Sequence, residues 1–174
     1  MGRPARPGVP GSRPYTGFDG VAPGIAGGTA QWILEARRTS GGMLANLGAY
    51  GVRPMRGKKQ TSVHATGRAW DAGYRTRKGR PAGRDRILPW LERIVEHNAE
   101  LGVEAILDYA FGAHGRGFFC DRQKWLVYQT DTILGGGNPA SQWFHIELSP
   151  EFAKAPALIR QGFDKAFPEI PRNA

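Results

Sequence analysis

The stretch SVHATGRAWDAGY, residues 62–74, places a histidine and an aspartate seven positions apart, with a glycine between them. Gly67 permits a tight turn after His64, and the short strand predicted for AWDA then returns Asp71 toward His64. This arrangement suits a hydrogen-bonded pair that stabilises a turn, and it also suits two ligands of a metal ion. The metal interpretation requires a third ligand elsewhere in the chain.

The segment QWFHIEL, residues 142–148, offers that third ligand because its polar and apolar residues alternate. Side chains alternate across a β-strand, so His145 and Glu147 are expected on one face and the apolar residues on the other. Two imidazoles and one carboxylate match a catalytic zinc site, which keeps a fourth position for water. Spacing alone leaves open the alternative that His145 is an ordinary sheet residue.

The remaining hydrophobic periodicity predicts helices and strands that follow no strict βαβ order. The expected helices are residues 29–38, 43–48, 85–101, closed by Gly102, and 151–167, interrupted or bent at Pro156. The expected strands are residues 50–55, 69–72, 103–110, 125–130 and 142–148. This mixture predicts an α+β fold with a small antiparallel sheet that is flanked by helices.

The length of 174 residues favours one domain, expected over residues 29–170, with a tail at 171–174. Residues 1–28 are rich in Pro, Gly and Arg, which predicts a flexible arm or a strapped-down extension without a part in the chemistry. The single cysteine, Cys120, excludes an internal disulfide and a multi-cysteine zinc cluster. No stretch approaches the roughly 20 apolar residues that a membrane span requires.

The net charge of +9 is concentrated in residues 53–86, which hold eleven basic residues and two acids, a difference of nine. A block of this kind attracts polyanions through a salt-sensitive, sequence-independent term. A solvated basic loop and a dedicated nucleic-acid site are the alternatives. No helix-turn-helix, zinc-finger or RNP-like pattern accompanies the block, so nucleic acid is not the first choice.

The stretch SVHATGRAWD resembles the Ser-x-His-x-x-Gly-x-Ala-x-Asp signature of the zinc D-Ala-D-Ala carboxypeptidase, lysostaphin-type and hedgehog superfamily. QWFHIEL resembles the second motif of that superfamily, which lies on a strand, and the order of the motifs agrees. The resemblance covers about residues 45–150. It implies that His64, Asp71 and His145 bind Zn²⁺ on the sheet and that Ser62 supports the first motif by hydrogen bonding. Arg68 stands at a variable position of the motif and is expected to brace the loop.

The resemblance also shows a departure at the catalytic base. Carboxypeptidases of this type carry a glutamate three residues before the last ligand, where this chain has Gln142, and an amide cannot cycle a proton. The lysostaphin-like alternative, a histidine two places before the ligand, is replaced by Trp143. Three explanations remain: Glu147 as the base, Asp131 or His114 from a loop, and loss of strong peptidase activity. Glu147 could instead only orient a ligand or pair with the basic segment.

By this resemblance, the leading hypothesis is a zinc metallopeptidase that hydrolyses stem peptides or cross-links of bacterial peptidoglycan. Arg56 or Arg53 would hold a substrate carboxylate or the developing oxyanion. The N-terminal residues lack the apolar run of a signal peptide, so we expect synthesis in the cytoplasm and action on the cell wall as a phage endolysin or virion component. The alternative is a catalytically weak or inactive zinc-binding domain that contacts other virion proteins or the wall.

Overall fold

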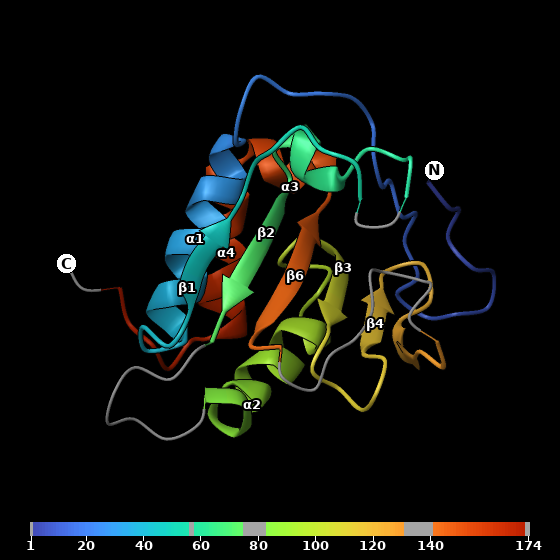
Figure 1. Cartoon of the computed structure of the whole chain (residues 1–174). Coiled ribbons are helices and arrows are strands. Elements are labelled where there is room, and N and C mark those ends of the chain that lie inside the picture. Colours follow the sequence, from blue (N-terminus) through green and yellow to red (C-terminus); the bar gives the residue numbers. More distant parts are fainter. Residues whose placement is uncertain (1, 56–57, 75–82, 131–140, 173–174) are drawn as a thin grey trace.

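Six strands form one antiparallel sheet in the order β1-β2-β6-β3-β4-β5 (Figure 1). The computed structural model describes residues 2–55, 58–74, 83–130 and 141–172. The last strand in the sequence, β6, is inserted between β2 and β3 and runs antiparallel to both. The strands are β1 (Ala45–Gly48), β2 (Ala69–Gly73), β3 (Val103–Asp108), β4 (Arg116–Phe119), β5 (Lys124–Val127) and β6 (Trp143–Leu148).

The helices and one face of the sheet enclose a single apolar core. In the core, Phe144 and Ile146 of β6 join Trp70 of β2 and Ile106 of β3, and all four are almost fully buried. Trp32 of α1 packs edge-on against Phe163 of α4, with ring centroids 5.2 Å apart. The helical elements are α1 (Gly27–Thr39), the 3₁₀ turn η1 (Val63–Thr66), α2 (Gly83–Glu96), α3 (Pro150–Lys154) and α4 (Pro156–Ala166).

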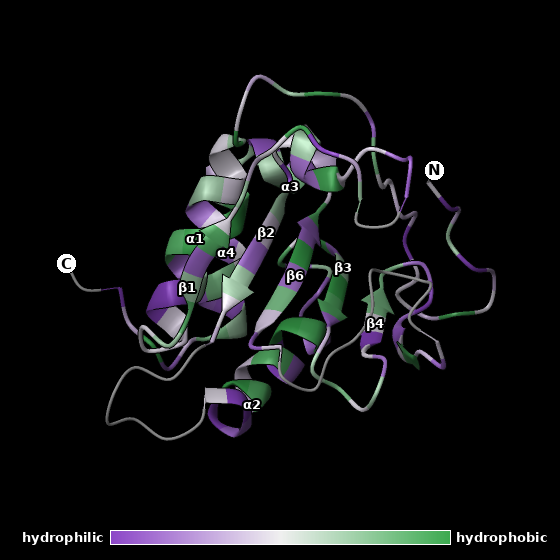
Figure 2. Ribbon diagram, viewed as in Figure 1, coloured by the Kyte–Doolittle hydropathy of each residue, from purple (hydrophilic) through white to green (hydrophobic). Residues whose placement is uncertain are grey.

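The opposite face of the sheet is polar at its centre. His145 and Glu147 alternate with the core residues of β6, and Figure 2 shows hydrophilic segments within β2 and β6. Both side chains are nevertheless buried, at 7% and 6% relative exposure. This face is therefore covered by another part of the chain.

Part of that cover is the N-terminal segment, residues 2–26. Arg3 forms a bidentate ion pair with Asp121, with N–O distances of 2.8 and 2.9 Å. Arg13 donates to the carbonyl oxygen of Val103 at 2.7 Å, and the N–H of Ala26 donates to the carbonyl of Gly67 at 3.1 Å. Of the two interpretations of this segment, these contacts correspond to a strapped-down extension.

The predicted helix 29–38 and the predicted strands at 69–72, 103–110, 125–130 and 142–148 are confirmed within a few residues. The long helix ends earlier than predicted, at Glu96, and Asn98 then donates through its side chain to the carbonyl of Val95 at 2.8 Å. Such a local hydrogen bond competes with the helical pattern. The break predicted at Pro156 is confirmed, because α3 and α4 meet at a non-helical Ala155.

The helix predicted at 43–48 is wrong, because Ala45–Gly48 pairs with β2 as an edge strand. Asn46 contributes to this pairing by accepting a hydrogen bond from the Trp70 indole at 3.1 Å. The predicted strand 50–55 is reduced to one isolated bridge between Pro54 and Thr61. The strand β4 was not predicted, because its sequence RGFF does not alternate between polar and apolar residues.

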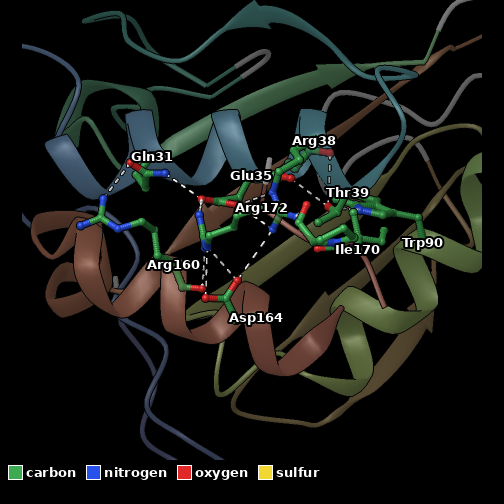
Figure 3. A network of polar contacts seen from close by, with 11 residues as sticks. Gln31, Glu35, Arg38, Thr39, Trp90, Arg160, Asp164, Ile170 and Arg172 are labelled. Carbon is green, nitrogen blue, oxygen red and sulfur yellow. Dashed lines mark hydrogen bonds and ion pairs between the residues drawn. The ribbon is translucent and has the colours of Figure 1, made fainter. Parts of the chain in front are cut away.

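The C-terminal segment is tied to the helices by a polar network (Figure 3). Arg172 donates to the buried carboxylate of Glu35 at 2.6 Å and to Asp164 at 2.9 Å. Arg38 bonds the same Glu35 and also donates to the carbonyl of Ile170 at 2.7 Å. The network joins α1, α4 and residues 170–172. Among the helices that the structure describes, none is long and apolar enough to cross a membrane.

Candidate metal centre

His64, Asp71 and His145 converge on the polar face of the sheet. Asp71 of β2 and His145 of β6 are direct cross-strand partners, so their side chains share one face. His145 Nδ1 lies 2.9 Å from Asp71 Oδ1, and His64 Nε2 lies 3.1 Å from the same oxygen. The structure thus brings together the three residues that the sequence predicts as ligands.

The turn before β2 places His64 at this site. Ser62 caps η1, because its hydroxyl oxygen accepts a hydrogen bond from the His64 N–H at 3.3 Å. Gly67 ends the turn in the left-handed conformation, with φ of 70°, and a Cβ atom there would collide with the carbonyl oxygen of Gly24. The cap at Ser62 and the left-handed turn at Gly67 therefore explain how the first motif holds His64 in place.

The three side chains fit a metal ion. One ligand atom from each residue lies within 4.8 Å of the others, and the group is largely buried. Tetrahedral zinc at 2.0–2.2 Å keeps its ligand atoms about 3.4 Å apart, so the observed 2.9 and 3.1 Å separations would widen by only tenths of an ångström. Two histidines and one carboxylate are also a donor set that zinc accepts.

The hydrogen bonds within the site favour a negative charge on Asp71 and a positive charge on His145. Burial opposes ionisation of Asp71, but hydrogen bonds with His145 and His64 outweigh burial and hold its pKa below the ordinary value. Burial also opposes protonation of His145, yet its bonds with Asp71 and Glu147 raise its pKa to about 9. Without a metal ion, His145 is therefore an imidazolium between two carboxylates near neutral pH.

Glu147 lies behind His145 and has both oxygens engaged. Its Oε1 is 2.9 Å from His145 Nε2, and its Oε2 accepts a hydrogen bond from the Tyr15 hydroxyl at 2.8 Å. These contacts are those of a group that orients the imidazole, which is one of the roles considered for Glu147. Its action as a base stays a prediction.

The other predicted site residues are spread around the centre. Gln142 is exposed before β6 and, unlike Ser141 and Trp143, does not line the cavity described below. Its carbonyl accepts a hydrogen bond from the Tyr74 N–H at 2.9 Å. Arg53 is half exposed, with its guanidinium 3.7 Å from Asp71 Oδ2. His114 lies in the turn before β4 and does not line the cavity described below. Arg56 and Asp131 lie outside the described residues.

Arg68 braces the first motif, as expected for this position. Its guanidinium is almost fully buried and donates to the carbonyls of Leu148 and Gly17 and to the carboxylate of Asp19. It also pairs with the buried Glu104 at 3.6 Å. One side chain therefore joins the first motif, the end of β6 and the N-terminal segment.

A cavity of about 940 Å³ opens above the three ligands. Its wall includes the cations Arg3, Arg53, Lys58 and Arg122, which outnumber its acids, Asp71 and Glu147. Trp143 and Tyr109 form an aromatic pair on the wall, with ring centroids 4.2 Å apart. The cavity therefore suits an anionic ligand that also has apolar parts.

The sequence analysis missed Tyr15 and Arg3, two residues of the N-terminal segment that line this cavity. The only sequence signal was a tyrosine in a segment otherwise rich in Pro, Gly and Arg. Tyr15 is 132 positions from Glu147, so local periodicity could not connect them.

No protein-family model, no curated protein and no solved structure matches the chain.

Proposed function

We propose that the protein is a zinc metallopeptidase-like hydrolase acting on the stem peptides of bacterial peptidoglycan, with a site on the sheet like that of the D-Ala-D-Ala carboxypeptidase and hedgehog superfamily. One observation carries the proposal: three ligand atoms of His64, Asp71 and His145 converge at the cavity. The motif SVHATGRAWD and the cationic wall support it. A phage endolysin or virion component is the setting that this function suits best.

Each residue has a definable task in this proposal. A zinc ion held by these three ligands would lower the pKa of a bound water molecule to about 7 and would polarise a carbonyl group. Glu147 accepts a hydrogen bond from the Nε2–H of His145, which leaves Nδ1, on the side of Asp71, as the ligand atom. Arg53, beside Asp71 and half exposed, is placed to pair with a carboxylate of the peptide.

A second candidate is a zinc-binding domain with weak or no peptidase activity that contacts the wall or other virion proteins. The observation that favours it is that no carboxylate of the site is free to transfer a proton among the residues that the structure describes. Gln142 occupies the position of the usual glutamate, and both oxygens of Glu147 are engaged by His145 and Tyr15. General acid and base catalysis contributes about 10²–10⁴-fold to a rate, so its loss would leave binding with little turnover.

Metal analysis of the purified protein tests what the two candidates share. We expect close to one zinc per chain in the unaltered protein and a large loss in Asp71→Ala and in His145→Ala. His97→Ala is the matched control, because this histidine lies beyond the end of α2 and does not line the cavity. An unaltered protein without stoichiometric zinc would contradict both candidates.

Hydrolysis of purified cell wall separates the two candidates. A peptidase should clear wall material in a gel overlay, and a chelator should stop the clearing until zinc is restored. Gln142→Glu should raise the rate if the base is the missing component. Zinc binding without clearing, in both the unaltered and the Gln142→Glu protein, would leave the weak or inactive domain as the function.

A further inference from the structure

A chain of hydrogen bonds leads from the N-terminal segment to the candidate metal ligand His145. The hydroxyl of Tyr15 donates to Glu147 Oε2 at 2.8 Å, and Glu147 Oε1 lies 2.9 Å from His145 Nε2. The other ring nitrogen, Nδ1, lies 2.9 Å from Asp71. We propose that Tyr15 is a positioning residue of the site, which fixes Glu147 and through it the orientation and ligand atom of His145.

The sheet leaves room for this contact. The residues paired with Glu147 on the two neighbouring strands are Ala69 of β2 and Ala105 of β3, both fully buried. Two small side chains beside one long carboxylate leave space above Glu147, and the Tyr15 hydroxyl reaches it there. Without a donor from outside the sheet, one oxygen of this buried carboxylate would be unsatisfied, which is costly.

Tyr15 is itself held in place by its neighbours. Its N–H and carbonyl exchange hydrogen bonds with the backbone of Arg3, at 2.9 and 2.7 Å. The Arg3 guanidinium lies 4.3 Å from the centre of the tyrosine ring, and Phe119 meets the ring edge-on at 5.3 Å. Because Arg3 is also paired with Asp121, the phenol is fixed to the sheet and not carried on a free arm.

The two histidines of the centre differ in the hydrogen-bond partners of their ring nitrogens. His64 Nδ1 is a buried atom without a hydrogen-bond partner in the described part of the chain, whereas both ring nitrogens of His145 face carboxylates. A carboxylate on the outer nitrogen fixes the tautomer and the plane of a ligating imidazole. Control of this kind is therefore concentrated on His145, and its outermost member comes from a segment that precedes the domain in the sequence.

The test compares Tyr15→Phe with Tyr50→Phe. The first variant removes only the hydroxyl that bonds Glu147. The second removes a hydroxyl that donates to the carbonyl of Ala22 at 2.7 Å, in the same N-terminal segment but without contact to the site. Two quantities are measured: the ¹⁵N chemical shifts of the His145 ring in the metal-free protein above pH 9, where the ring is neutral and the shifts report its tautomer, and the affinity for Zn²⁺ by competition with a chromogenic chelator.

We expect Tyr15→Phe to move the His145 ring shifts and to lower zinc affinity about tenfold. Loss of a residue that hydrogen-bonds a metal ligand typically lowers affinity about 10- to 100-fold, and the smaller value is expected because Tyr15 acts through Glu147. Tyr50→Phe should change neither quantity. Unchanged ring shifts and affinity in Tyr15→Phe would overturn the inference. The link to metal affinity rests on the proposed function, but the ring shifts do not: an unaltered protein without zinc affinity would refute that function, and the shifts would still decide the positioning role.

Discussion

At the scale of single residues, the pKa of His145 is strongly perturbed by its two carboxylate neighbours. Its pKa is raised to about 9 in the folded, metal-free protein, against about 6.5 for an ordinary histidine, because Asp71 and Glu147 flank the ring. A group with a raised pKa stabilises the fold fully below its unfolded pKa, and this contribution is lost as pH rises through the folded pKa. The metal-free protein should therefore lose stability between about pH 6.5 and 9.

The loss from His145 should be on the order of 3 kcal/mol. Urea denaturation of the chelated protein at several pH values measures it. His145→Gln should abolish most of this slope, whereas His97→Gln should retain it. Saturating zinc should stabilise the protein more as pH rises, because the metal competes with the proton for Nδ1. A chelated protein whose stability is flat across this window would contradict the arrangement of charges around His145.

Cys120 gives a second residue-scale prediction. Burial raises the pKa of its thiol to about 11, and its sulfur lies 3.5 and 3.4 Å from the carbonyl oxygens of Arg13 and Pro14. The thiolate is the reactive form, so alkylation at pH 8 should be on the order of 100-fold slower in the folded protein than in urea. Mass spectrometry of the single cysteine after timed iodoacetamide treatment measures the ratio. Similar rates would mean that residues 13–14 open readily.

At the scale of elements, the sequence predicts what depends on local pattern. The alternation in QWFHIEL gave β6 with His145 and Glu147 on one face, and the 3.6-residue periodicity gave the core of α2. Elements set by distant partners could not be predicted: β1 becomes a strand only through pairing with β2, and β4 lacks alternation. The same limit explains Tyr15, whose role depends on a contact across the whole domain.

The turn between η1 and β2 should be sensitive to one added carbon. Gly67 has a φ of 70° and its position approaches the Gly24 carbonyl, whereas Gly41 has a φ of 63° and open space around it. Gly41→Ala should lower the free energy of unfolding by about 1–2 kcal/mol, because alanine is strained in the left-handed conformation. Gly67→Ala should cost clearly more, because the new methyl group must displace residues 24–26.

Urea denaturation of both variants checks this expectation, and zinc affinity provides a second measure. Gly67→Ala should weaken zinc binding because the turn positions His64, while Gly41→Ala, beyond the end of α1, should leave it unchanged. Equal losses of stability in the two variants would show that the N-terminal segment moves away from Gly67 without cost.

At the scale of the whole molecule, part of the positive charge that the sequence places in residues 53–86 is used in internal ion pairs. Within the basic block of residues 53–86, Arg68 and Arg84 are committed to ion pairs with Asp19 and with the buried Asp108. The exposed basic residues of the block within the described part of the chain are Arg53, Lys58, Lys59 and Arg86. Arg53 and Lys58 line the cavity, so they should act on anionic ligands near the metal centre.

Polyanion binding should therefore depend on where a charge lies as well as on the total. Lys58→Gln with Lys59→Gln should lower the salt concentration that elutes the protein from an immobilised anionic polymer, because binding releases counterions in proportion to the contacts made. Lys154→Gln with Lys165→Gln removes the same charge from exposed positions of α3 and α4 and should lower it less. His64→Ala should leave retention unchanged, since the attraction needs no metal. Equal shifts from the two double variants would mean that net charge alone, and not the cavity rim, draws polyanions to the protein.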